Sequence, residues 1–551
     1  MSSGSAVVRR VNVNINTHAK ANEPVVATTD ADANARPRSV SWWSEFTHSM
    51  FDEVPAHSIA VARAFWFLVM MWEIYSYTEF DYVKTRYQLV EPTFLFHYYG
   101  FDWVPRLSFE QWKLFLNVML VLGGMASAGL FYHQAAFAFA LGFAFLFLQC
   151  MSFYLNHFYL VAVLGFAYAF VPANRFWSLD ALLGIAKPSP TVPFWTVAMT
   201  RILVSVVYVY AGYAKMNEDW IRGEPLAHWV PRRALLYPAL APILNSYWNA
   251  VFMSWAGLLI DTLVPFLFLV PRLRWLGFLA SFAFHVLNKI IFNIGIFPMV
   301  MTCVTTIFFR PDWPRVVWRV VTRQRDPLRA DTESVRSNRR APLRPLQRVV
   351  LLLLGSFLLW QTLLPLRHHF YAGAVEWNEE GHMFSWRMKL RDKAGMTKFY
   401  IKFNDTDGVQ KTEVVDPNAV LTQTQVRKMN GRPQMILLFA LHLANLVEEQ
   451  LRSRPAVHVL SICSLNYRRP QLLIDPTVNL AEAEPWQWIS DWIIDLVPRG
   501  VDEHPAFIKG GRDAGSDDSK NRLYVAYNHL TIDDVIEQVS QARALANKTK
   551  K

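Results

Sequence analysis

Cysteine is scarce in this chain of 551 residues, which contains only Cys150, Cys303 and Cys463. So few and so widely spaced cysteines exclude a disulfide-stabilised scaffold and leave the redox compartment open. The N-terminus also lacks the basic, apolar and small-residue order of a cleavable signal peptide. We expect the polar residues 1–45 to form a disordered tail. A transit peptide is the alternative, because the first acidic residue is Glu23.

Several catalytic signatures are missing as well. The chain has no P-loop, no glycine-rich dinucleotide fingerprint and no Gly-x-Ser-x-Gly elbow. Its histidines lack the spacing of metal ligands with a third ligand. We therefore predict neither nucleotide nor serine-hydrolase chemistry, and no metal site.

The chain has fewer acidic residues than basic ones, 44 against 55, and its formal net charge is +11. Nucleic-acid binding requires a basic stripe on a soluble fold. Here, however, eleven arginines fall within residues 310–348, between two apolar stretches. Arginine enrichment of that kind is typical of cytoplasmic loops in membrane proteins. We predict contact with membrane lipid and no nucleic-acid partner.

Long apolar runs dominate the first two thirds of the chain. A helix needs about 20 mostly apolar residues to cross a bilayer. We predict a multi-pass α-helical membrane bundle of about 8 to 9 segments over residues 46–366. The nine candidate segments are 58–77, 112–132, 134–153, 157–172, 193–213, 249–270, 275–292, 294–309 and 348–366.

Three basic connections set the expected orientation. Residues 175–187, 271–274 and 310–348 all fall on the same side if the N-terminus is cytoplasmic. The same count places the loop at 214–248 and everything after residue 366 on the exoplasmic face.

The C-terminal part, residues 367–551, has shorter apolar runs and predicts an exoplasmic α+β domain with a polar C-terminal tail. Alternating apolar and polar residues over 384–391 predict a strand, one face of which carries Arg387, Lys389 and Arg391. This face either attracts an acidic peptide or is simply solvated. Further strands are predicted at 399–403, before a turn at 404–408, and at 457–465 and 471–474, with helices at 422–451 and 531–546.

A few ionisable residues lie within the predicted membrane segments, where they are costly unless they face a partner or a wet cavity. They are Arg201, Lys215, Asp261, His285 and Lys289, with His157 at a segment start. Arg201 and Asp261 lie towards the middles of consecutive segments. We predict that these two residues form a structural ion pair, in preference to a direct chemical role.

Lys215 ends the run Tyr208-Val-Tyr-Ala-Gly-Tyr-Ala-Lys215 at the exoplasmic end of its segment. It either extends to the membrane interface or is enclosed by apolar and aromatic walls, which would make its neutral amine available as a base. His157 and His285 are expected at a similar depth. Each is either a packing residue or part of one pocket with Lys215, and the sequence leaves both alternatives open.

At these residues the chain resembles the vitamin K-dependent γ-glutamyl carboxylases and their bacterial relatives, which share a horizontally transferred transmembrane domain. The matching stretches keep the family order over residues 58–476. They are Leu155-Asn-His-Phe-Tyr-Leu160, Asn174-Arg-Phe-Trp-Ser-Leu-Asp-Ala-Leu-Leu183, Ala211-Gly-Tyr-Ala-Lys-Met-Asn-Glu-Asp-Trp-Ile-Arg-Gly223, Phe284-His-Val-Leu-Asn288, Ile294-Gly-Ile-Phe-Pro298, Phe384-Ser-Trp386 and Ser464-Leu-Asn466 with Arg468, Gln471 and Asp475-Pro476.

The resemblance implies that vitamin K hydroquinone is a co-substrate, with O2 and CO2, and that a Glu-containing protein is the acceptor. A lysine base deprotonates the hydroquinone, oxygen adds, and the resulting strong base removes a proton from the γ-carbon of glutamate. The carbanion captures CO2, and vitamin K epoxide is the second product.

By position, the resemblance makes Lys215 the base and makes His157 with Asn156 the support of the oxygenated intermediate. His285 would line the same pocket. The quinone-binding wall would comprise Ile294, Phe297, Met301 and Met388.

One segment departs from the animal carboxylases. Glu379-Glu-Gly-His382 differs from their pattern just before Phe384-Ser-Trp386, and their C-terminal region is longer. A quinone epoxidase without protein carboxylation is therefore one alternative, and a non-enzymatic transporter or scaffold is another. The membrane would be the endoplasmic reticulum in a eukaryote and the inner or plasma membrane in a bacterium.

Overall fold

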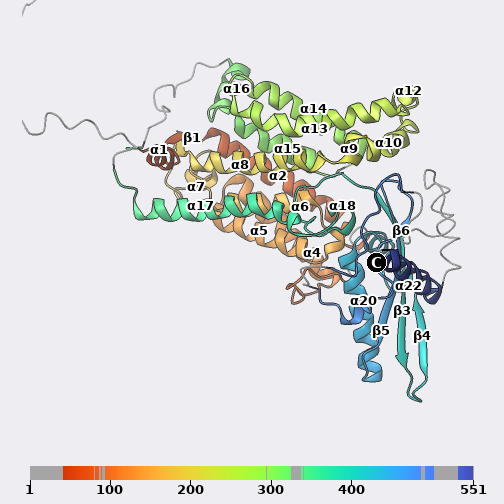
Figure 1. The fold of residues 1–551 in the computed structure, drawn as a ribbon. Coiled ribbons are helices and arrows are strands. Elements are labelled where there is room, and N and C mark those ends of the chain that lie inside the picture. Colours follow the sequence, from red (N-terminus) through yellow and green to blue (C-terminus); the bar gives the residue numbers. More distant parts are fainter. Residues whose placement is uncertain are drawn as a thin grey trace, which may run out of the picture.

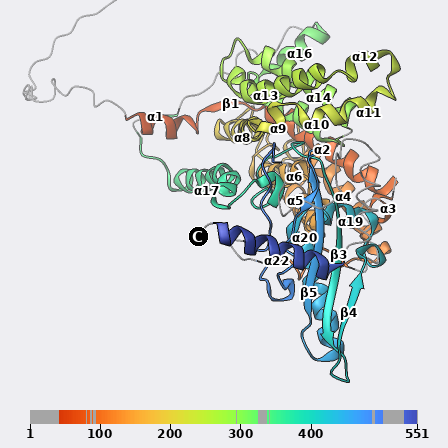
Figure 2. The same cartoon turned by 45° about the vertical axis from the view of Figure 1, so that its right-hand side comes forward.

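The computed structural model describes residues 41–79, 81–85, 89, 94–292, 294–323, 337–338, 341–485, 490–501 and 531–549. A bundle of helices makes up one part of the molecule, and a sheet with flanking helices makes up the other (Figures 1 and 2). Most of the predicted tail at residues 1–45 lies outside the described residues, and helix α1 begins within it at Trp42.

All nine predicted segments coincide with described helices. The principal helices of the bundle are α2 (His57–Glu79), α4 (Phe109–Ala128), α5 (Tyr132–Leu148), α6 (Asn156–Phe170), α8 (Trp195–Lys215), α13 (Tyr247–Leu269), α14 (Arg274–Phe292), α15 (Phe297–Thr305) and α17 (Pro345–Leu363). Shorter elements connect them: α1 (Trp42–Ser49), α3 (Tyr82–Thr85), α7 (Leu179–Leu182), α9 (Glu218–Ile221), α10 (Glu224–Trp229), α11 (Pro231–Ala234), α12 (Ala241–Leu244) and α16 (Trp313–Thr322). A two-stranded sheet joins β1 (Glu53–Pro55) to β2 (Thr191–Pro193).

Five helices are long and apolar enough to cross a membrane: α2, α8, α13, α14 and the helix from Pro345 to Phe370 that contains α17. The helices α5, α6 and α15 are apolar but shorter. In the most apolar stretch of α17 only 11% is buried, and in that of α14 only 22%. Apolar surfaces of this extent are unstable in water, which favours a position of α14 and α17 in a membrane.

Local sequence explains where the helices begin and how closely they pack. Ser108 and Gln111 form a reciprocal capping box at the start of α4. Gly212 lets α8 approach α13, because a Cβ there would lie 2.7 Å from Thr262 Oγ1 and 3.0 Å from the Thr262 backbone nitrogen. Small residues permit this kind of contact between membrane helices.

The C-terminal part contains a four-stranded antiparallel sheet in the order β4-β3-β5-β6. Its strands are β3 (Lys393–Asn404), β4 (Gln410–Val415), β5 (Ala456–Leu465) and β6 (Gln471–Leu472). Helices α19 (Gln423–Met429) and α20 (Pro433–Leu451) occupy the predicted helical region 422–451, and α22 (Ile532–Thr549) matches the last predicted helix. A short helix, α18 (Val375–Asn378), precedes the sheet.

Side chains alternate across this sheet, as the period of a strand requires. Phe399 of β3 packs against Phe439 of α20, with ring centroids 5.0 Å apart. Its neighbour Tyr400 faces the opposite way, into a cluster with Ile532 and Val535 of α22. The sheet therefore lies between α20 and α22, which confirms the predicted α+β character of this region.

The predicted strand at 384–391 is wrong. Phe384, Trp386 and Lys389 have positive φ angles of 61°, 58° and 55°, so the backbone cannot extend there. Phe384 and Trp386 instead pack against Tyr159 of α6, with ring centroids 4.8 and 5.1 Å away. The apolar residues alternate in this segment because they pack against the helical bundle, and not because they belong to a sheet.

Polar contacts join the two parts of the molecule. Asp219 of α9 accepts hydrogen bonds from Arg468 at 2.7 Å, Asn466 at 2.9 Å and Arg499 at 3.0 Å. Burial alone would raise the pKa of Asp219. The hydrogen bonds from Asn466 and Arg468, together with the charge of Arg499, instead hold this pKa below its ordinary value.

Candidate active site

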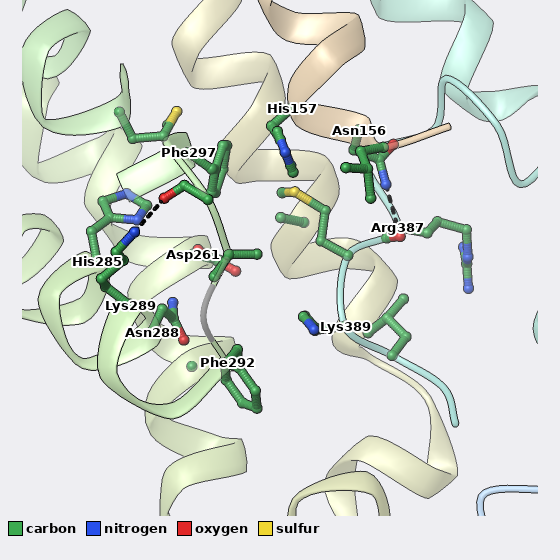
Figure 3. Close-up of a pocket in the computed structure, with 18 of the residues that line it drawn as sticks. Asn156, His157, Asp261, His285, Asn288, Lys289, Phe292, Phe297, Arg387 and Lys389 are labelled. Carbon is green, nitrogen blue, oxygen red and sulfur yellow. Dashed lines mark hydrogen bonds between the residues drawn. The ribbon is translucent and has the colours of Figure 1, made fainter. Parts of the chain in front are cut away.

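A cavity of about 1080 Å³ lies where the helical bundle meets the C-terminal part. Helices α6, α8, α13, α14 and α15 supply its apolar walls, and residues 379–393 and 427–432 close the other side. Figure 3 shows His285, Asn288 and Lys289 of α14 across the pocket from His157 and Asn156, with Lys389 on the segment that passes below. Its volume is slightly above the usual range for small-molecule sites, which is about 300–1,000 Å³.

Lys215 and Asp261 form a buried ion pair in this cavity. The Lys215 Nζ donates to Asp261 Oδ2 at 2.6 Å and to the carbonyl of Ala211 at 3.2 Å. The two side chains are only 6% and 5% exposed, and the amine also lies 5.2 Å from the ring centre of Trp220. Lys215 is therefore enclosed by aromatic and apolar groups and does not extend to the membrane surface.

The predicted ion pair between Arg201 and Asp261 is wrong. Arg201 donates instead to the backbone carbonyls of Ile307 and Phe309, both at 2.9 Å. These carbonyls lie at the C-terminal end of the short helical segment Thr306–Phe308. The negative end of the helix dipole favours a cation there. Arg201 thus has a structural role of another kind, and Lys215 takes its place beside Asp261.

Both predicted histidines line the cavity and are buried. Phe297 lies between them, with its ring centroid 5.8 Å from that of His157 and 5.6 Å from that of His285. The His285 Nε2 shares a hydrogen bond with the Tyr208 hydroxyl at 2.8 Å, and this hydroxyl also contacts Ser281 Oγ at 2.6 Å. Among the described residues, His285 Nδ1 has no hydrogen-bond partner.

The four residues of the predicted quinone wall also line this cavity. Ile294, Phe297 and Met301 come from α15 and the turn before it, whereas Met388 comes from the C-terminal part. Phe297 and Met301 are buried. The structure thus brings together residues from two distant regions of the sequence. Their apolar side chains fit a lipophilic ring system better than a charged ligand.

Asn156 connects the bundle to the segment that closes the cavity. Its amide donates to the carbonyl of Arg387 at 3.0 Å and accepts from the Tyr154 hydroxyl at 2.9 Å. The oxygen of the same hydroxyl accepts a hydrogen bond from the backbone N–H of Phe384, with 2.5 Å between nitrogen and oxygen. Asn156 therefore positions the loop as well as lining the cavity, as Figure 3 shows.

Ion pairs fix the basic residues on this loop. Arg387 pairs with Glu376, and Arg391 pairs with Glu379, which also accepts from Lys393 at 3.0 Å. Burial alone would raise the pKa of Glu379, but the charges of Arg391, Lys393 and Arg432 hold it below its ordinary value. Arg387 and Arg391 are therefore not the solvated strand face that was one of the two predictions.

His382 belongs to the same cluster. Its ring accepts a hydrogen bond from Arg391 at 2.7 Å. Burial and the nearby charges of Arg391, Arg432 and Arg387 lower its pKa well below the ordinary value. The divergent segment 379–382 therefore contributes a neutral imidazole and a carboxylate to the wall of the cavity.

Sequence reasoning missed the part played by Tyr208. It precedes Lys215 by seven residues, which is two helical turns and places both on one face of α8. That spacing was visible in the sequence. The pairing of Asp261 with Lys215 was not, because it depends on how far α8 and α13 are shifted along each other. No group of three or more His, Cys, Asp or Glu residues that could hold a metal occurs in the described part of the chain.

Two family models match the chain. The HTTM domain matches residues 51–313, and the lumenal domain of vitamin K-dependent gamma-carboxylase matches residues 346–498. No solved structure matches the chain. Both matched ranges contribute residues to the cavity, Lys215 from the first and Arg391 from the second. With this pair of domains in order along about three quarters of its length, the chain belongs to the vitamin K-dependent γ-glutamyl carboxylase family.

Proposed function

We propose that this protein γ-carboxylates glutamate side chains of a protein substrate and couples this reaction to oxidation of vitamin K hydroquinone to its epoxide. The observation that carries the proposal is the cavity that both parts of the chain line. It joins a buried lysine–carboxylate pair among apolar helices to a cationic wall supplied by the C-terminal part. A lipophilic quinone enters from the bilayer and a glutamyl peptide from water, so both reach such an interface.

The residues present fit vitamin K hydroquinone. Ile294, Phe297 and Met301 offer an apolar wall, and Lys215 offers an amine within the same cavity. When bound, the hydroquinone and O2 supply the strong base that abstracts the glutamate γ-proton, and the carbanion then adds to CO2. The cavity is large enough for a ring system and a glutamyl side chain together.

Lys215 acts as the general base once the ion pair has moved a proton from the Lys215 amine to the Asp261 carboxylate, 2.6 Å away. The neutral amine then takes a proton from a hydroquinone hydroxyl, and the ammonium that this transfer produces stays hydrogen-bonded to Asp261. A positioned base of this kind contributes about 10²–10⁴-fold to a rate. Asp261 is thus part of the chemistry and not only of helix packing.

His157 supports the oxygenated quinone, while Tyr208 fixes the ring of His285. The apolar wall excludes water, which protects a carbanion from protonation before CO2 arrives. Orientation of the C-terminal part towards the exoplasmic side, in the endoplasmic reticulum or a bacterial inner membrane, belongs to the same proposal. On the exoplasmic side of either membrane, the C-terminal part would meet proteins that are being secreted.

The test uses the full chain in nanodiscs with vitamin K hydroquinone, O2, labelled bicarbonate and a Glu-containing peptide. We compare wild type with Lys215→Ala, and use Lys411→Ala as the control because Lys411 is an exposed residue of β4 paired with Asp405. Label fixed into peptide together with epoxide, both lost only in Lys215→Ala, supports the carboxylase.

Epoxide without fixed label would replace this function by that of a quinone epoxidase that lacks protein carboxylation. Neither product, under conditions in which a known carboxylase is active, would overturn the enzymatic proposal. The function of a non-enzymatic transporter or scaffold would then be the better hypothesis for this protein.

A further inference from the structure

The wall of the cavity that belongs to the C-terminal part is strongly cationic. Its acidic lining residues are Glu379 and Asp392. Its cationic lining residues outnumber them and are Arg387, Lys389, Arg391, Lys393, Arg427, Lys428 and Arg432. Because the cavity walls are largely apolar elsewhere, this excess of positive charge favours an anion at that end.

Most of these cations already have a fixed partner. Arg391 and Lys393 share Glu379, and Arg387 pairs with Glu376. Arg432 donates to the carbonyl of Met151 at 3.2 Å. Lys389 lies 5.3 Å from the ring centre of Phe292 and 5.8 Å from that of Trp229.

Lys428 is different: like Arg427 it has no such partner within the described ranges, and unlike Arg427 it carries an amine. It lies on α19, it is half-buried, and it lines the cavity. Within the described ranges its amine makes no hydrogen bond or ion pair. Burial and the charges of Arg432, Arg427, Arg391 and Lys389 lower the pKa of Lys428 to about 7. A large share of the amine is therefore neutral and nucleophilic near neutral pH.

We propose that the Lys428 amine reacts reversibly with CO2 to form a carbamate, which gives the cavity a covalent CO2-binding site. The inference rests on the proposed carboxylase function, which requires CO2 in this cavity. The amine nitrogen bonds to the carbon of CO2, one carbon–oxygen π pair moves to oxygen, and the displaced amine proton passes to water.

The surroundings favour this product. The carbamate carries one negative charge where the ammonium carried one positive charge, so Lys428 changes from repelling its neighbours to attracting them. Arg432, four residues further along the chain, and Arg391 line the same wall, and the positive charges that disfavour an ammonium at Lys428 would stabilise an anionic carbamate there. Reversal of the reaction releases CO2 into the cavity that holds the glutamate carbanion.

The test traps the carbamate directly. Full-length protein in nanodiscs is equilibrated with ¹³C-bicarbonate and CO2, without hydroquinone or peptide, and alkylated with a trialkyloxonium salt that esterifies carbamates. Peptide mass spectrometry then locates the label. We expect labelled ester at Lys428 in wild type and in the control Lys411→Arg, and none at this position in Lys428→Arg, which keeps the positive charge but lacks a nucleophilic amine.

A second measurement uses the coupled reaction. The CO2 concentration that gives half-maximal carboxylation should rise severalfold in Lys428→Arg, while the half-saturating hydroquinone concentration stays unchanged. A glutamate-carboxylate contact at Lys428 would instead raise the half-saturating peptide concentration, and this result would overturn the carbamate proposal.

The two proposals fail in distinguishable ways. Wild-type protein that carboxylates peptide but yields no label at Lys428 would overturn the carbamate and leave the carboxylase standing. Label at Lys428 in a protein that carboxylates no peptide would support the carbamate site and count against the carboxylase.

Discussion

Replacing Lys215 by methionine and Asp261 by leucine, singly and together, separates the structural effect of this pair from its chemistry. The Lys215 amine and the Asp261 carboxylate are 2.6 Å apart, and both side chains are nearly inaccessible. At that distance and an effective dielectric constant of about 20, their attraction is about 6 kcal/mol. Desolvation of both groups opposes most of this gain.

Either single variant leaves one buried charge without its partner. We expect each to lower the free energy of unfolding by about 3–5 kcal/mol, whereas the double variant replaces the pair by apolar groups of similar volume and recovers most of the loss. The double variant should nevertheless oxidise hydroquinone at least about 10²-fold more slowly than wild type, because the base is absent.

The assay measures thermal unfolding in nanodiscs and hydroquinone oxidation on the same samples. Wild-type oxidation by the double variant would show that Lys215 is not the base. Full stability of Asp261→Leu would refute the claim that the ion pair holds α8 against α13. Stability restored without activity is the outcome that the structure leads us to expect.

Three further changes test the surroundings of the site. Gly212→Val should separate α8 from α13 at a cost of about 1–3 kcal/mol, as measured by thermal unfolding, whereas Gly355→Val on α17 should be neutral because nothing lies within 4 Å of its added Cβ. Tyr208→Phe removes a hydroxyl that joins two side chains of α14. It should raise the KM for hydroquinone more than it lowers kcat, and the opposite split would contradict a positioning role. Asp219 has a lowered pKa when folded, so its stabilisation is present above about pH 4 and is lost as the pH falls through the folded-state pKa. Unfolding measured between pH 7 and pH 3 should therefore show a smaller acid-induced loss for Asp219→Asn, and an equal loss would refute this linkage.

The helices of the bundle could be predicted because the apolar length needed to cross a bilayer is a local property of the sequence. Each of the nine predicted segments falls on a helix, from α2 to α17, and five helices meet the length and composition needed for a membrane span. The strands β3 and β5 were predictable for a similar reason, since their side chains alternate between two apolar layers. Residues 384–391 share this alternation, but there the packing partner is Tyr159 of α6.

The partner of Asp261 was not predictable from depth alone. Arg201 and Asp261 both lie towards the middles of consecutive segments, which predicts a similar depth in the membrane for the two residues. Arg201 and Lys215 are fourteen residues apart on α8, or about 21 Å along the helix axis. The structure shows that α13 extends beyond the end of α8, so that Asp261, well inside α13, meets the last residue of α8. The spacing of apolar residues in each helix is the same whatever the shift between the two helices along their axes, so the sequence does not reveal this shift.

The division of the cavity between two parts of the chain has a chemical consequence. The proposed base, Lys215, and most of the apolar wall come from the bundle, whereas most of the cations that would favour a carboxylate come from residues 387–432. In the proposed function, the bundle would supply most of the apolar place for a quinone, and the C-terminal part most of the charge that faces glutamate. The bond from Asn156 to the Arg387 carbonyl ties the start of α6 to the loop that closes the cavity. If the proposed function holds, docking of the two parts is a condition of the coupled reaction, because a loosened loop would admit water to the glutamate carbanion before it captures CO2.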